Sequence, residues 1–335
     1  MTPETVLNVG SITKTITATA AMQLWEQGKF TLADPINDYL PFVVRNPFHP
    51  HTAITIGQLL THTSSIRDGS AYSTSYACGD PTMPLGSWLE QYLRVNGALY
   101  QAQESFYDWE PGARFSYSNV GFGLLGYLIE TTSGTPFAHY CQAHIVAPLG
   151  MQETFWYLRD LKPSQHAVPY TYVSNGDVHG VPLRDPTWTG GESNKAVYVP
   201  HCLYGFPTLP DGLLRTTVSD LARFLMAYLD GGIYEGRRIL QEETIRTMRS
   251  EEVAASQQLD IPGVGSGIYG LGWYGQKLHS GEFVWGHGGG DPGISTLMFA
   301  RLSDRVGAIV LANAYENTGG RRDIIERLLQ HAAEF

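Results

Sequence analysis

The spacing of apolar side chains separates the chain into helical and strand-rich stretches. Within residues 12–28, apolar positions recur every four residues from Ile12 to Leu24, which predicts a helix with one buried face that ends at Gly28. Comparable patterns predict further helices over residues 87–96, 119–133, 137–146, 217–230, 241–249 and 321–333. The middle of the chain is therefore mainly helical.

The final third of the chain has a different pattern. Short runs rich in β-branched and aromatic residues, separated by tight turns, occupy residues 269–276, 282–287, 295–301 and 307–315. They predict an antiparallel meander, and a sheet that follows a helical region favours the α+β class. Residues 63–86 and 159–212 lack a regular period. We predict a long surface excursion for the first and loops with short strands along a cleft for the second.

Composition then narrows the class of protein. The 335 residues include 22 Lys and Arg against 32 Asp and Glu, and the resulting formal charge of −10 argues against a nucleic-acid partner. No run approaches about 18 apolar residues, so we predict no transmembrane helix. Cys78, Cys141 and Cys202 are too few and too scattered for a disulfide framework or a zinc knuckle. An acidic globular protein, most often an enzyme, remains.

The N-terminal residues bear on localisation. Residues 1–5 contain neither a basic segment nor an apolar one, so no secretory signal is visible. We therefore expect a cytoplasmic protein from the sequence as written, and a periplasmic or secreted one if the true N-terminus is longer.

The first candidate for chemistry is the pair Ser11 and Lys14 at the start of the first helix. A spacing of three places both side chains on one helical face, and a desolvated lysine can accept the proton of a serine nucleophile. The helix N-terminus also offers backbone N–H groups to an oxyanion. A capping serine beside a solvated lysine is the alternative, and it is the stronger one if the pair stands alone.

The second candidate is Tyr117 with Asn119, at the start of the helix over residues 119–133. A cationic lysine would stabilise the phenolate of Tyr117, which could then shuttle a proton. Asn119 offers a donor and an acceptor to a substrate amide. A buried tyrosine and a helix-capping asparagine are the structural alternative.

The third candidate is His287 with Gly288, Gly289 and Gly290, at the end of a predicted strand. Glycines allow a substrate to approach the backbone, and the imidazole could donate to Tyr117 or to an oxyanion. A glycine-rich hairpin turn with an incidental histidine is the alternative.

The order of these motifs resembles the serine β-lactamase-like, penicillin-recognising hydrolases. The resemblance is strongest to the branch with class C β-lactamases, DD-peptidases, D-aminopeptidases and β-lactamase-fold esterases. Residues 59–64 (LLTHTS) and 269–273 (YGLGW) resemble this branch as well, so the likeness covers nearly the whole chain. It implies one catalytic unit over residues 1–335, with a sheet-containing region (1–30 and 213–335), a mainly helical region (31–212) and the active site between them.

The resemblance also implies roles for the candidate residues. Ser11 would accept the acyl group, with Lys14 and Tyr117 as its proton-transfer partners. The oxyanion would bind the backbone N–H groups of Ser11 and Gly290. Water would then attack the acyl-Ser11 ester, with Tyr117 as its activator, and no metal or organic cofactor is required.

Substrate binding would fall to the remaining motif residues, namely Asn119, His287, Gly288, Gly289 and Gly290. The family has Lys-Thr-Gly or Lys-Ser-Gly where this chain has His287-Gly288-Gly289. A titrating imidazole thus replaces a permanent cation, so we expect weak turnover of β-lactams and better turnover of neutral esters or amides.

The start of the chain also differs from the family, which places a helix and about two strands before the Ser-x-x-Lys motif. Only ten residues precede Ser11. The sheet is then smaller, completed by another chain, or cut short by the gene model, and an uncovered sheet edge would favour a homo-oligomer.

The function expected from the sequence is that of a serine hydrolase. We rank an esterase on small or medium acyl esters first, and a D-stereospecific peptidase or amidase, or a weak β-lactamase, second. An inactive binding or scaffold protein of the same fold is the alternative from another class. The Gly-x-Ser-x-Gly pentapeptide required by α/β-hydrolase lipases does not occur.

Overall fold

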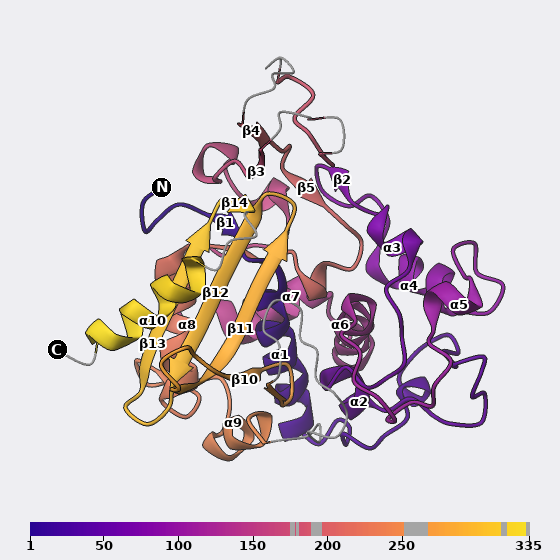
Figure 1. Cartoon of the computed structure of the whole chain (residues 1–335). Coiled ribbons are helices and arrows are strands. Elements are labelled where there is room, and N and C mark those ends of the chain that lie inside the picture. Colours follow the sequence, from indigo (N-terminus) through magenta and orange to yellow (C-terminus); the bar gives the residue numbers. More distant parts are fainter. Residues whose placement is uncertain (175–177, 179–180, 189–195, 251–266, 316–319, 333–335) are drawn as a thin grey trace.

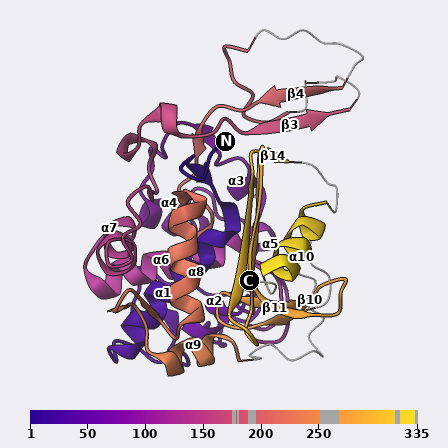
Figure 2. The same cartoon turned by 90° about the vertical axis from the view of Figure 1, so that its left-hand side faces the viewer.

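A five-stranded antiparallel sheet with helices on both faces organises the structure (Figure 1). The computed structural model describes residues 1–174, 178, 181–188, 196–250, 267–315 and 320–332. Helix α10 packs against one face of the sheet, and α8 packs against the other, in front of α1 and the remaining helices (Figure 2). The architecture is the α+β class that the sequence pattern predicts.

The sheet has the strand order β13-β12-β11-β10-β9. Its strands are β9 (Ile268–Tyr269), β10 (Tyr274–Lys277), β11 (Phe283–Asp291), β12 (Ile294–Arg301) and β13 (Val306–Ala312). Shorter strands lie outside it: β1 (Leu7–Asn8), β2 (Ala77–Cys78), β3 (Tyr170–Val173), β4 (Val197–Pro200), β5 (Tyr204–Gly205), β6 (Arg215–Thr216), β7 (Ile233–Tyr234), β8 (Arg237–Arg238) and β14 (Ala314–Tyr315). Strand β13 forms one edge of the five-stranded sheet.

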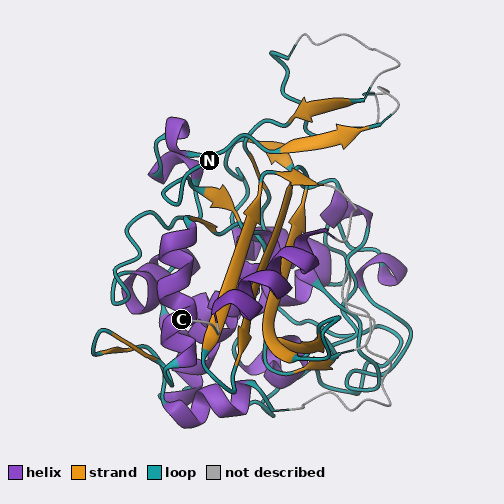
Figure 3. Cartoon of the chain, turned by 60° about the vertical axis from the view of Figure 1, so that its left-hand side comes forward, coloured by secondary structure: helices purple, strands orange, loops and turns teal. Residues whose placement is uncertain are grey.

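Helices are the other regular elements of the described chain, and loops connect them (Figure 3). The α-helices are α1 (Thr13–Glu26), α2 (Ile56–Leu60), α3 (Ser70–Ser73), α4 (Leu85–Leu93), α5 (Ala102–Ser105), α6 (Asn119–Ser133), α7 (Phe137–Cys141), α8 (Val218–Leu229), α9 (Glu242–Met248) and α10 (Gly320–Ala332). Short 3₁₀-helices are η1 (Gly10–Ile12), η2 (Ile36–Asp38), η4 (Leu158–Asp160), η5 (Pro163–Gln165) and η6 (Leu209–Asp211), and a π-helical turn, η3 (Gln142–Val146), continues α7. None of the described helices is long and apolar enough to cross a membrane.

Helix α1 is the centre of the hydrophobic core. All of its residues from Thr13 to Leu24 are buried, including the polar ones. The threonines Thr15 and Thr19 avoid a desolvation cost because their hydroxyls donate to main-chain carbonyls one turn earlier. A helix buried on every side holds its N-terminal turn in a fixed position, and that turn carries Ser11 and Lys14.

Helix α6 has the bounds that the sequence predicts, because both of its ends are specified locally. The side chain of Ser118 caps the N-terminus by accepting from the Gly121 N–H at 2.9 Å. Gly134 ends the helix with φ +67°. Its apolar face, which includes Leu124 and Leu128, is fully buried.

Two predicted segments differ from the structure. The glycines after His287 lie inside β11 rather than in a turn after it, because this strand continues to Asp291 and pairs with β12 along its length. The stretch over residues 63–86 lies only partly at the surface: Ala77 and Cys78 are exposed, whereas Tyr72 is buried and the segment contributes to the cavity described below.

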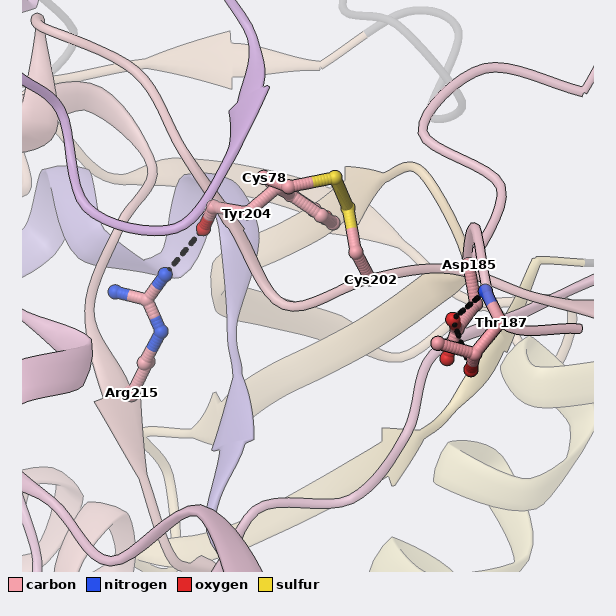
Figure 4. Close-up of a disulfide and its surroundings, with 6 residues drawn as sticks. All are labelled: Cys78, Asp185, Thr187, Cys202, Tyr204 and Arg215. Atoms are coloured by element: carbon pink, nitrogen blue, oxygen red, sulfur yellow. Dashed lines mark hydrogen bonds between the residues drawn. A yellow bond between two sulfur atoms is a disulfide. The ribbon is translucent and has the colours of Figure 1, made fainter.

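A disulfide joins Cys78 to Cys202, a pairing that the sequence did not indicate (Figure 4). The bridge lies where β2 pairs with β5, and the two cysteines are 124 residues apart in the chain. The third cysteine, Cys141, is buried and free. The disulfide thus connects residues 63–86 to the irregular region that precedes β6.

Loss of this disulfide should lower stability, because a long loop regains its freedom in the unfolded chain. We expect the double substitution Cys78→Ser with Cys202→Ser to reduce the free energy of unfolding by about 2–4 kcal/mol. Urea unfolding of both proteins, with and without reductant, measures the change. Reductant should destabilise the wild type and leave the double variant unaffected, and an equal response of the two would contradict the prediction.

Candidate active site

The turn that carries Ser11 lies directly against strand β11. Gly10 adopts φ +54°, and a Cβ atom there would lie 3.1 Å from the backbone nitrogen of Gly290. A Cβ on Gly289 would lie 2.0 Å from the carbonyl oxygen of Val9. Only glycines allow this approach of two backbones, and it places the N-terminal end of η1 beside the Gly288–Gly290 stretch.

Lys14 is fully buried, and its ammonium contacts three oxygens from separate parts of the chain. Its Nζ lies 3.1 Å from Ser11 Oγ, 2.6 Å from Asn119 Oδ1 and 2.8 Å from the main-chain oxygen of Asp211. Burial lowers the pKa of Lys14 to about 8, although nearby carboxylates oppose the shift. The neutral amine, which can accept a proton, is therefore available near neutral pH.

The phenol of Tyr117 adjoins the same ammonium. Lys14 Nζ lies 4.8 Å from the centre of the Tyr117 ring. Among the described residues, no group meets hydrogen-bonding geometry with the buried Tyr117 hydroxyl. Ser11 is nevertheless close to it, and this proximity acts to lower the pKa of Tyr117. Burial holds the pKa of Tyr117 well above its ordinary value. This direction is opposite to the phenolate stabilisation expected from the sequence, because the charges of nearby aspartates add to the effect of burial on the pKa.

Asn119 is held in one orientation by Asp68. The Asp68 carboxylate accepts from the backbone N–H and the Nδ2 of Asn119, at 2.8 and 2.9 Å, and also from Ser118 Oγ and the Val120 N–H. With Nδ2 engaged, Oδ1 faces Lys14. Because Nδ2 carries a second hydrogen and Asn119 lines the cavity, its binding of a substrate amide stays a prediction, while its Oδ1 positions the lysine.

His287 belongs to a directional chain of hydrogen bonds. The Ser118 N–H donates to His62 Nδ1 at 3.0 Å, so His62 Nε2 carries the proton and donates to the Tyr269 hydroxyl at 2.9 Å. That hydroxyl donates to His287 Nε2 at 3.4 Å, and His287 Nδ1 donates to the Gly288 carbonyl at 2.6 Å. Each member of the chain thereby fixes the tautomer of the next.

The environment of His287 corrects two expectations from the sequence. The ring is 2% exposed, and burial with the nearby Lys14 lowers its pKa to about 3. It is therefore a neutral group and not a titrating one. Its nitrogens are engaged with Tyr269 and Gly288, so it does not donate to Tyr117 or to an oxyanion as the sequence analysis expected.

A cavity of about 580 Å³ opens beside these residues. Its lining includes every residue that the sequence analysis singled out except the buried Lys14, namely Ser11, Tyr117, Asn119, His287, Gly288, Gly289 and Gly290. Within the described part of the chain, no group of three or more His, Cys, Asp or Glu side chains could hold a metal ion. The predicted site residues thus meet at one cavity.

Sequence reasoning missed four ionisable residues in or around the site: His62, Asp68, Asp211 and Asp291. Two of them lie within motifs that were noted for other residues, since His62 belongs to the LLTHTS segment and Asp291 follows Gly290. Asp68 and Asp211 lie in stretches without a regular period. No sequence signal identifies them, because only the tertiary fold brings Asp68 to Asn119 and Asp211 to the cavity.

The fold is of the α+β class, and at its cavity a buried lysine adjoins a serine. The Beta-lactamase family matches residues 1–333, and the chain belongs to this family. The match lies in the branch that includes penicillin-binding proteins, DD-peptidases and D-amino acid amidases.

Similar proteins are penicillin-binding proteins, peptidases and amidases. A penicillin-binding protein of Bacillus subtilis (strain 168) is 28% identical, over 96% of this chain and 63% of its own length. The D-alanyl-D-alanine-carboxypeptidase/endopeptidase AmpH of Escherichia coli (strain K12) is 24% identical, over 92% and 71%. The chain spans 62–63% of the length of the first curated relatives it matches.

Two solved structures share the fold. A D-stereospecific amidohydrolase from a Streptomyces species is 27% identical with a TM-score of 0.68, covering 96% of this chain and 86% of that one. An octameric penicillin-binding protein homologue from Pyrococcus abyssi is 25% identical with a TM-score of 0.70, covering 99% and 67%. The oligomeric state belongs to that homologue.

Removal of the Asp68 carboxylate should destabilise the protein, because four hydrogen bonds at the N-terminus of α6 depend on it. We expect Asp68→Ala to lower the free energy of unfolding by roughly 3 kcal/mol. The matched variant Ser118→Ala removes the helix cap and should cost about 1 kcal/mol. Urea unfolding compares the two, and equal losses would contradict the role assigned to Asp68.

Proposed function

We propose that the chain is a serine acyl hydrolase in which Ser11 forms an acyl-enzyme. The observation that carries the proposal is the Lys14 amine, buried and 3.1 Å from Ser11 Oγ. A neutral amine accepts the Ser11 proton as Oγ bonds to the substrate carbonyl carbon. The backbone N–H groups of Ser11 and Gly290 would stabilise the oxyanion, which is worth about 3–4 kcal/mol per donor.

Tyr117 fits the role of the acid in the second half of acylation. Its raised pKa keeps the hydroxyl protonated, so it can donate to the leaving group as the carbonyl–leaving-group bond breaks, and Lys14 can return a proton to it. In deacylation, the neutral Lys14 amine accepts a proton from the attacking water, and as the ester C–O bond breaks Ser11 Oγ leaves with a proton from the same pair. Lys14 therefore precedes Tyr117 as the first proton acceptor in this scheme.

The substrate class we propose is an amide of a D-amino acid or of a D-residue in a peptide. Relatives named as a D-alanyl-D-alanine carboxypeptidase and a D-stereospecific amidohydrolase support an amide substrate. We therefore place amides ahead of the small or medium acyl esters that the sequence analysis ranked first. A neutral, buried His287 in place of the family's lysine supports weak turnover of β-lactams.

A substrate panel tests the class of reaction. D-amino-acid p-nitroanilides should be hydrolysed faster than their L-enantiomers, nitrocefin should be slow, and Ser11→Ala should lose at least about 10³-fold in kcat/KM. A fluorophosphonate probe should label Ser11 in the wild type. An unlabelled Ser11 would favour an inactive scaffold protein. Rapid hydrolysis of p-nitrophenyl esters without hydrolysis of any amide would instead favour an esterase.

The titration of Lys14 predicts the pH dependence of acylation. Its pKa is about 8, so below that pH the ammonium form predominates and cannot accept a proton. The rate of Ser11 labelling should rise about tenfold per pH unit below the inflection and level off above it. Lys14→Arg, which stays charged, should lose 10²- to 10⁴-fold.

The pKa of Asp211 is also about 8, so a second variant is needed to show which group causes the inflection in the labelling rate. Asp211→Asn removes a negative charge that raises the pKa of Lys14. The inflection should then move to lower pH. Its disappearance in this variant, or a flat profile in the wild type from pH 6 to 9, would rule out Lys14 as the titrating base.

A further inference from the structure

Two carboxylates that the reaction scheme does not use lie beside the nucleophile. Asp211 is 1% exposed, and its main-chain oxygen accepts from Lys14. Asp291 directly follows Gly290 at the end of β11. A Cβ atom on Gly212 would lie 3.7 Å from Asp291 Oδ2 and 3.9 Å from the carbonyl carbon of Gly10. The Asp291 carboxylate is therefore next to the turn that carries Ser11, and both aspartates line the cavity.

Each carboxylate has one oxygen bound by a tyrosine. Tyr72 donates to Asp211 Oδ1 at 3.2 Å, and Tyr76 donates to Asp291 Oδ1 at 2.9 Å. The buried Asp211 Oδ2 has no partner of hydrogen-bonding geometry among the described residues, although Thr208 is near enough to lower its pKa. The two tyrosine hydroxyls are 3.3 Å apart, so the two carboxylates that they hold lie in the same part of the cavity.

No cation of the described chain forms an ion pair with either carboxylate. Lys14 contacts only the main chain of Asp211. The guanidinium of Arg215 is close enough to act on the Asp291 charge but donates to the main-chain carbonyls of Trp156, Leu213 and Tyr204. Burial raises the pKa of Asp211 to about 8 and that of Asp291 to about 7. Buried carboxylates in this state lack the positive group that would compensate their desolvation.

The other charged side chains of the cavity are cationic and lie elsewhere. Arg321 and Arg322 come from α10, and Arg322 donates to the Lys277 carbonyl on β10 at 2.6 Å. The cavity is therefore acidic beside the nucleophile and basic near β10.

We propose that Asp211 and Asp291, held by Tyr72 and Tyr76, bind the protonated α-amino group of the substrate. The proposal rests on the proposed function and specifies its substrate as an amide with a free amine. An α-nitrogen lies about 2.5 Å from the carbonyl carbon that Ser11 attacks. A subsite for it must therefore adjoin the oxyanion donor, which is the position of Asp291.

An ammonium group matches the remaining acceptor oxygens of Asp211 and Asp291. It has three donors and no acceptor, so it can donate to the unpaired Asp211 Oδ2 and to Asp291 Oδ2 together. An N-acylated substrate has neither the charge nor the three donors, so it would leave Asp211 Oδ2 and Asp291 Oδ2 without this partner. The site should therefore select amides of free D-amino acids, or the N-terminal residue of a D-peptide, over N-acylated analogues.

The experiment compares D-alanine p-nitroanilide with N-acetyl-D-alanine p-nitroanilide. The wild type should prefer the free amine, and Asp291→Asn should lower the ratio of the two kcat/KM values about 10- to 100-fold, mainly through KM. Tyr76→Phe, which removes the hydroxyl that holds Asp291, should lower the ratio less. Asp230→Asn is the matched control, because Asp230 is exposed and paired with Arg305, outside the cavity; it should leave the ratio unchanged.

The possible results distinguish failure of the subsite from failure of the proposed function. A wild-type preference for the N-acetyl substrate, or an equal loss on both substrates in a folded Asp291→Asn, would overturn the subsite. Fluorophosphonate labelling of Ser11 reports separately on the nucleophile, and the thermal midpoint reports on folding. Absence of both labelling and turnover would overturn the proposed function, whereas labelling without a preference for the free amine overturns only the subsite.

Discussion

The burial of one ammonium group determines the rest of the site. Lys14 lies inside the protein with no carboxylate in contact, held only by a hydroxyl, an amide oxygen and a main-chain carbonyl. Such dipoles orient the amine without stabilising its charge as an anion would, so proton acceptance becomes accessible near neutral pH. The three oxygens come from η1, α6 and η6, and the lysine therefore works only when all three are packed together.

Close contact between backbones supplies the second constraint. Gly10 and Gly289 let the turn of the nucleophile reach β11, a strand of the central sheet, with no side chain between them. The reacting groups are thereby mounted on the core helix α1 and on the sheet.

Sequence patterns predicted the helices and strands well and the protonation states of the site residues poorly. Helix α6 and strands β12 and β13 follow from periodicity and turn residues, and the Ser-x-x-Lys spacing located Ser11 and Lys14. The single strand-like run predicted over residues 269–276 is two strands in the structure, because a turn separates β9 from β10. The protonation states expected for Tyr117 and His287 were wrong, because a pKa depends on burial and on partners that are distant in the chain. Asp68 and Asp211 escaped detection for the same reason.

The disulfide gives the cleft a dependence on its chemical surroundings. Cys78 lies two residues after Tyr76, whose hydroxyl holds Asp291, and the bridge anchors that tyrosine to the segment around Tyr204. Disulfides persist in oxidising compartments and are lost in reducing ones. If the chain folded in a reducing compartment, Ser11 and Lys14 would keep their positions. The segment around Tyr76, which lines the cavity, would be less constrained. On the proposed function, redox conditions would then change which substrates are bound and leave Ser11 and Lys14 in place.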